Sequence, residues 1–182
     1  LTTMVQAIRS GSNLSVEASV AAVKQLLGLG SNVSSADLLN LDPVESAYAS
    51  TTTADKVKYL QLYAKSAQVA NILVVGAAAV QKAAGSSTVS MSQASTLVVN
   101  ALAKTYADQG STVSAVDLSS ASFVGSVLGN VQNVSVSNAS AVATALANVN
   151  AAVSTAINQT NPDSKASLNV LVATEYASQY NL

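Results

Sequence analysis

The stretch QVANILVVGAAAVQK, Gln68 to Lys82, decides the fold class of this chain. Its middle twelve residues, Val69 to Val80, include one polar side chain, that of Asn71. A bilayer crossing needs about 20 mainly apolar residues, whereas polar residues close this run at both ends. We therefore predict no membrane span. A helix that is apolar all round and too short to cross a membrane is expected to be packed on every side by other helices.

The residues on either side extend this run into the longest predicted helix, Ala54 to Ala84. At 1.5 Å per residue it would be about 45 Å long. The run Thr51 to Thr53 precedes it as a capping segment, and Gly85 follows it as a stop. Its first half is amphipathic and its second half is the apolar run. We expect it to be the central helix of the domain.

Local start and stop signals predict further helices on both sides. Ser15, Asp42 and Ser90 are predicted N-caps, and Gly28 is a predicted stop. The expected helices cover residues 2–10, 16–27, 43–49, 91–107, 137–157 and 162–180, with a weaker one through Leu128 that begins at Asp117 or Ser119. The segments 112–118 and 134–137 alternate like strands, which leaves a minor β-pairing as an alternative.

These patterns predict an all-α fold, a bundle of seven or eight helices around a central hydrophobic helix at about 54–84. A chain of 182 residues suits one domain, so residues 1–182 are taken as a single α-helical domain. The helical pattern is already running at Leu1. We therefore expect a processed product or a segment of a larger protein.

Composition excludes several classes of function. The eight Lys and Arg residues are scattered singly, so no basic stripe exists that could bind nucleic acid. Histidine and cysteine are absent, which removes the commonest general base, the commonest metal ligands and the most reactive nucleophile. We predict that the protein is not an enzyme and carries no metal and no cofactor. Charged residues are 9% of the chain, and Ser, Thr, Asn and Gln supply most of its polarity, a composition that favours an extracellular or cell-surface location.

The nine acidic residues are better explained as structural than as catalytic. Asp42 and Glu45 form the closest pair that an acid-base or cation site would use, but capping of a helix explains both. Asp108, Asp117 and Asp163 stand in predicted turns or at helix starts, where carboxylates accept backbone N–H groups. Capping is thus the favoured interpretation of all five.

The acceptor signature Asn-x-Ser/Thr occurs five times, and every copy lies in a predicted turn or at a helix end. In a eukaryotic source some of them are expected to carry N-glycans. These candidate N-glycosylation sites are Asn13, Asn32, Asn133, Asn138 and Asn158.

The first third of the chain contains the segments LTTMVQAIRSG, LSVEASVAAVKQLLGL and LLNLDPVESAYA, and the element A-Q-V-x-N follows at Ala67 to Asn71. In these segments the chain resembles a helical module of very large secreted or surface proteins of bacteria and algae, adhesin-like proteins in which the module often follows cadherin-like repeats. The resemblance covers residues 1 to about 80 and implies a non-catalytic part of a surface or matrix protein. The chain is poorer in acidic residues than that family.

Two hypotheses of function follow. The first is a non-catalytic extracellular structural or adhesive domain, whose partners are other protein subunits or domains of the same assembly. The alternative is a carrier that holds a lipid, carotenoid or tetrapyrrole in a cavity between helices. Gly76 and Ala77 to Ala79 would let a flat ligand lie close, but they would equally let a helix do so.

Overall fold

The computed structural model of the chain describes residues 1–12, 15–40, 42–108, 115–164, 167, 169, 170, 172 and 173. Within them lie eight helices and no strand, which confirms the predicted all-α bundle. They are α1 (Thr2–Ser12), α2 (Val16–Leu27), α3 (Ser35–Asn40), α4 (Pro43–Ala49), α5 (Thr53–Ala84), α6 (Met91–Asp108), α7 (Ala121–Gly129) and α8 (Ala139–Gln159). The predicted helix 162–180 and the segment 112–114 lie largely or wholly outside the described residues.

Side-chain caps begin several helices where the sequence predicts them. The Ser15 side chain accepts a hydrogen bond from the Ala18 N–H at the start of α2. Asp42 Oδ1 accepts bonds from the backbone N–H groups of Val44 (2.8 Å) and Glu45 (3.1 Å) at the start of α4. Each bond satisfies a donor that the first helical turn leaves without an intrahelical partner. The predicted capping role of Asp42 is therefore confirmed.

Several helix starts differ from the prediction. The short helix α3 was not expected, although Ser34 and Asp37 form its reciprocal capping box: the Ser34 N–H donates to Asp37 Oδ2 at 2.7 Å, and the Asp37 N–H donates to Ser34 Oγ at 3.1 Å. The cap of α7 is Ser120, and neither Asp117 nor Ser119 caps it. Helix α8 begins at Ala139, two residues after the predicted start at Ser137.

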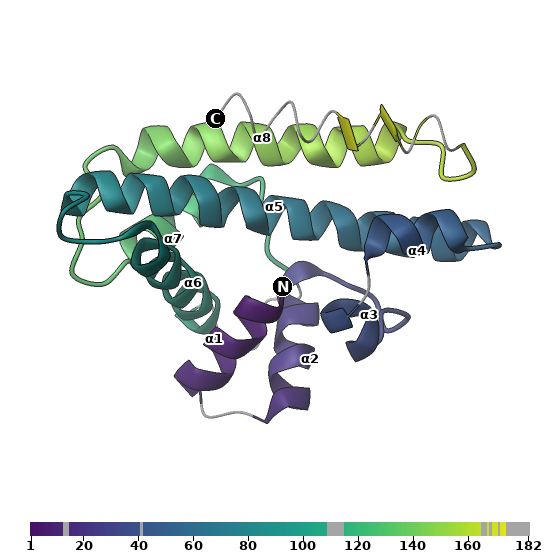
Figure 1. Cartoon of the computed structure of the whole chain (residues 1–182), viewed down its shortest axis with the longest axis horizontal. Coiled ribbons are helices and arrows are strands. Elements are labelled where there is room, and N and C mark those ends of the chain that lie inside the picture. The colour runs from purple at the N-terminus through teal and green to yellow at the C-terminus, as the bar shows by residue number, and fades with distance from the viewer. Residues whose placement is uncertain are drawn as a thin grey trace.

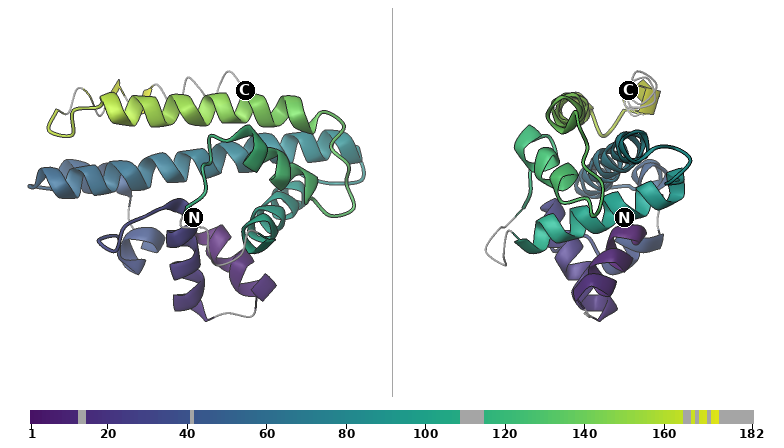
Figure 2. Two further views of the ribbon diagram at one scale, coloured as in Figure 1. Left: turned by 180° about the vertical axis from the view of Figure 1, so that it is seen from behind. Right: turned by 90° about the vertical axis from the view of Figure 1, so that its left-hand side faces the viewer.

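Helix α5 forms the axis of the molecule, and α8 runs beside it in the opposite direction (Figures 1 and 2). Helices α1, α2 and α3 lie on the other side of α5, and α4 packs along its first turns. Helices α6 and α7 lie near the far end of α5, where the loop into α8 also turns (Figure 1). This arrangement puts α5 at the centre, as predicted.

Small aliphatic side chains build most of the core, in agreement with the low aromatic content. The main cluster joins α1, α2, α5, α6, α7 and α8, and Leu26, Ile72, Val98 and Leu146 in it are fully buried. A smaller cluster sits between α4, α5 and α8, where three tyrosines surround Ala47 and Leu60. At the crossing of α5 and α6, a Cβ added to Gly76 would lie 3.2 Å from Val98 Cγ1. Glycine there lets the two helices approach closely.

The central apolar run is not packed on every side, so that expectation was wrong in part. Val74 is 66% exposed and Ala78 is exposed on the same face of α5. Conversely, Gln68, expected to mark the polar end of the run, is only 1% exposed. The neighbouring helices therefore bury only part of the circumference of this run and leave the edge with Val74 and Ala78 exposed.

Candidate functional site

Several acidic residues in the described part of the chain serve in turns and ion pairs. Asp117 accepts from the Ser119 backbone and hydroxyl at 2.9 Å, closing a turn before α7. Lys104 pairs with Asp108 at 2.8 Å along α6, and Lys56 pairs with Asp163 at 2.8 Å between α5 and the turn after α8. Among the described residues no three His, Cys, Asp or Glu side chains come together as a metal site.

The most buried of these charges, Asp37, joins α3 to α5. Its carboxylate lies 3.7 Å from Lys58 Nζ and 3.4 Å from the Tyr59 hydroxyl. Burial alone would raise the pKa of Asp37, but hydrogen bonds from Ser34, the Lys58 charge and the Tyr59 hydroxyl together lower it. For Lys58, burial lowers the pKa, whereas Tyr59 and the two neighbouring acids raise it above its usual value. The pair therefore stays ionised and ties the N-terminal helices to α5.

Lys65 on α5 has a different environment. Its side chain is half-buried, and this burial lowers its pKa. The charge of Asp117 opposes the shift without cancelling it. A lysine with a lowered pKa is a candidate for covalent chemistry, but no described cavity has Lys65 in its wall.

A buried cluster of amides crosses the interface between α5 and α8. Asn71 Nδ2 donates to Asn150 Oδ1 at 3.1 Å, and Gln68 Nε2 donates to the Asn150 carbonyl and to Ser154 Oγ, both at 2.8 Å. Asn150 Nδ2 in turn donates to the Leu118 carbonyl at 2.8 Å. Gln68, Asn71 and Asn150 are each no more than 1% exposed.

This amide cluster was not foreseen as a unit. The only signal in the sequence was the position of Asn150 on the apolar stripe of α8, one turn from Leu146 and Val153. Buried amides that bond one another favour a single register of two packed helices. Among the described groups, Gln68 Oε1 has no hydrogen-bond partner. The three amides are buried, so we interpret the cluster as a structural lock.

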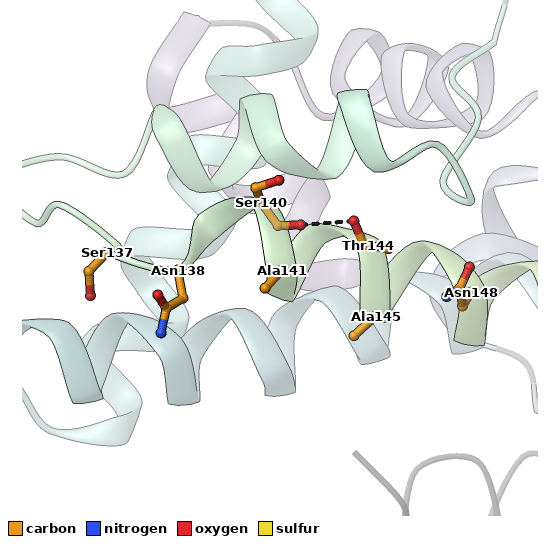
Figure 3. A pocket seen from close by; sticks show the side chains of 7 residues that line it. All are labelled: Ser137, Asn138, Ser140, Ala141, Thr144, Ala145 and Asn148. Carbon is orange, nitrogen blue, oxygen red and sulfur yellow. Dashed lines mark hydrogen bonds between the residues drawn. The ribbon is translucent and has the colours of Figure 1, made fainter.

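An open groove of ≈ 660 Å³ lies on the outer face of α8 and is lined by described residues (Figure 3). Its wall carries no charged and no aromatic side chain; it consists of Ser137, Asn138, Ser140, Ala141, Thr144, Ala145 and Asn148. The Thr144 hydroxyl bonds back to the Ser140 carbonyl at 2.9 Å, as the dashed line in Figure 3 shows. The floor of the groove is therefore a neutral surface of small side chains with a few polar groups.

The structure describes four of the five candidate N-glycosylation sites and leaves Asn13 outside the described residues. Asn32, Asn133, Asn138 and Asn158 are all exposed. Asn32 and Asn133 stand in turns, Asn138 precedes α8, and Asn158 lies in its last turn. Asn133 adopts a left-handed backbone with φ 60°, which asparagine tolerates better than most residues.

The space that the carrier hypothesis assigned to a flat ligand is filled by helices. Beside Gly76 stand Val98 of α6 and Leu128 of α7, the latter 3.6 Å from where a Cβ would be. The other described hollows are open grooves: one of ≈ 450 Å³ between α1 and α6, and one of ≈ 460 Å³ before α7. A carrier site would therefore need a cavity other than the one beside the central glycine.

In the described part of the chain two helices, α5 and α8, are long and apolar enough to cross a membrane by length and composition. The mean hydropathy of the most apolar 18-residue stretch is 1.3 in each. A buried core helix passes the same test, and 44% of that stretch of α5 is buried in the protein.

Comparison of the chain with known protein families, with curated proteins and with solved structures gave no match. The residues themselves thus carry the argument for function.

Proposed function

We propose that this protein is a non-catalytic structural domain that packs against neighbouring subunits or domains of an extracellular assembly. The observation that carries the proposal is the uncharged outer edge of α5, where Val74 is 66% exposed and Ala78 lies beside it on the next turn. Exposed apolar surface on a helix supports contact with another protein. The resemblance of residues 1 to about 80 to a module of large surface proteins points the same way.

The distribution of charge along the chain also supports the outer edge of α5 as a contact surface. No charged residue occurs between Lys65 and Lys82, or anywhere in residues 118–162. The charged side chains concentrate instead around α2, α3, α4 and the start of α5. A neutral face contributes little repulsion between neighbouring molecules, which favours association.

The strength of the contact follows from its size. Stable interfaces between two proteins bury about 1,200–2,000 Å² in total, more than one edge of a single helix offers. We therefore expect weak association of separate molecules, which becomes effective where many copies or linked domains line up. Neither α5 nor α8 is assigned to a bilayer, because α5 uses its apolar face against α6 and α8 and both helices hold amides in their shared interface.

The test is sedimentation equilibrium over a wide range of protein concentration. The wild-type chain should show weak, concentration-dependent self-association, and Val74→Lys should abolish it. Val57→Lys is the matched control, since Val57 is 39% exposed on the same helix but lies among charged residues. A wild-type protein that stays monomeric at the highest concentration, or association that Val74→Lys leaves unchanged, would contradict the proposal.

A further inference from the structure

The asparagine that precedes α8 differs from the other caps. Ser15, Asp42, Thr52 and Ser120 each accept a backbone N–H with their side chains. Asn138 occupies the equivalent position, but its side chain makes no capping bond. Its amide is exposed and stands at the end of the groove on α8, as Figure 3 shows.

Asn138 also begins the acceptor signature Asn138-Ala139-Ser140. Ser140, which supplies the hydroxyl of the signature, lies in the wall of the same groove. The amide nitrogen that an N-glycan would use is therefore free, outward and next to a hollow. The groove has a volume of ≈ 660 Å³ and is open to solvent, since all the residues of its wall are exposed.

The chemistry of the groove suits sugar. Ala141 and Ala145 supply small apolar patches against which the C–H face of a sugar ring can lie. Thr144 and Asn148 supply a hydroxyl and an amide that can bond sugar hydroxyl and acetamido groups. These positions succeed one another along the exposed face of α8, so the groove leads away from Asn138 for nearly three turns, or about 15 Å.

The other described acceptor sites lack this combination. The Asn32 side chain is folded over Gly30, its Oδ1 only 2.6 Å from where a Cβ would be. Asn158 is itself helical, and the hydroxyl of its signature residue Thr160 donates to the Ala156 carbonyl at 2.7 Å. Asn133 is exposed in a turn, but it is not among the residues that line the groove.

We propose that Asn138 carries an N-linked glycan and that the groove on α8 seats its innermost sugars. The step joins the Asn138 side-chain nitrogen to C1 of an N-acetylglucosamine delivered as a lipid-linked oligosaccharide diphosphate; the diphosphate leaves, and the amide gives up one proton. The inference rests on the extracellular location in the proposed function. The glycan would cover a surface of α8 that carries no charge of its own.

The experiment is secretion of the full chain from a eukaryotic cell line, followed by glycopeptide mass spectrometry and hydrogen exchange. Asn138 should be occupied, and Ser140→Ala should abolish that occupancy while leaving the asparagine in place. Amides of residues 140–148 should exchange several-fold more slowly in the glycosylated chain than in Asn138→Gln. Enzymatic removal of the glycan is a poor comparison, because it converts Asn138 to Asp, which would cap α8 by itself.

Two variants distinguish attachment of the glycan to Asn138 from packing of that glycan in the groove on α8. Asn133→Gln is the matched control, since loss of a glycan at Asn133 should not change exchange in residues 140–148. Ala145→Gln should fill the groove, keep the glycan and restore fast exchange. If Asn138 is unmodified, the whole proposal is wrong. If Asn138 is glycosylated but hydrogen exchange in residues 140–148 is unchanged, the glycan does not pack in the groove. Both results are independent of self-association, which is measured on the unglycosylated chain from bacteria.

Discussion

Removal of the Asn150 side chain is the sharpest test of how α5 and α8 are held together. In Asn150→Ala the Leu118 carbonyl loses its side-chain donor, and Asn71 loses the oxygen that it contacts at 3.1 Å. A buried polar group left without its partner costs about 1–3 kcal/mol. The Leu118 carbonyl left without this donor and the small void bring the expected loss of unfolding free energy to about 2–4 kcal/mol. This is a large part of the about 5–15 kcal/mol typical of a domain.

The assay is urea unfolding followed by far-ultraviolet circular dichroism. Asn148→Ala is the matched control: it lies on the exposed face of the same helix, gains the same helix propensity, and should change stability by no more than about 0.5 kcal/mol. The double variant Asn71→Ala/Asn150→Ala should lose less than the sum of the single losses, by about 0.5–3 kcal/mol. If Asn150→Ala and Asn148→Ala unfold at the same urea concentration, the amide cluster does not stabilise the interface and this reasoning is wrong.

Three further predictions concern packing, capping and pH. Gly76→Val should lower the unfolding free energy by about 1–3 kcal/mol, because even its Cβ would stand 3.2 Å from Val98; an unchanged thermal midpoint would contradict the close approach of α5 and α6. Ser120→Ala should cost about 1 kcal/mol in urea unfolding, and more than Ser119→Ala, because Ser120 is the residue that caps α7. The pKa of Asp37 is lowered in the fold, so its contribution to stability is present above the ordinary value of 3.8 and is lost as the pH falls through the lower folded value. Asp37→Asn should therefore reduce the fall in unfolding free energy between roughly pH 6 and pH 2. If the unfolding free energy of the variant falls as steeply as that of the wild type, Asp37 does not contribute to the acid sensitivity.

Helix boundaries were predictable where the signal is local. A cap bonds to a backbone group two or three residues away, so Asp42 and Ser90 could be read without knowledge of the fold. The missed helix α3 had a signal of the same kind, the Ser34–Asp37 capping box. At α7 the prediction was Asp117 or Ser119, and it was wrong, because the residue that accepts the hydrogen bond from the Phe123 N–H is Ser120.

For the candidate sites as well, the sequence reveals local signals, and only the fold reveals which distant residues come together. The five Asn-x-Ser/Thr signatures are visible in any sequence, but only the fold puts Asn138 beside a groove and folds Asn32 over Gly30. The amide cluster could not be predicted, because Gln68 and Asn150 are 82 residues apart. Nothing close to either residue in the sequence marks it as a partner of the other.

The sequence by itself determined the all-α class, the central place of α5 and most helix starts, because periodicity and caps depend on neighbours within a few residues. Only the tertiary structure decided which side of α5 is buried, that Gln68 lies in the core and that Val74 lies outside it. The twelve-residue run is apolar all round, so its own pattern favours no face. The neighbouring helices therefore decide which face of α5 is buried, because Asn150 of α8 bonds Gln68 and Asn71, and Val98 of α6 packs beside Gly76.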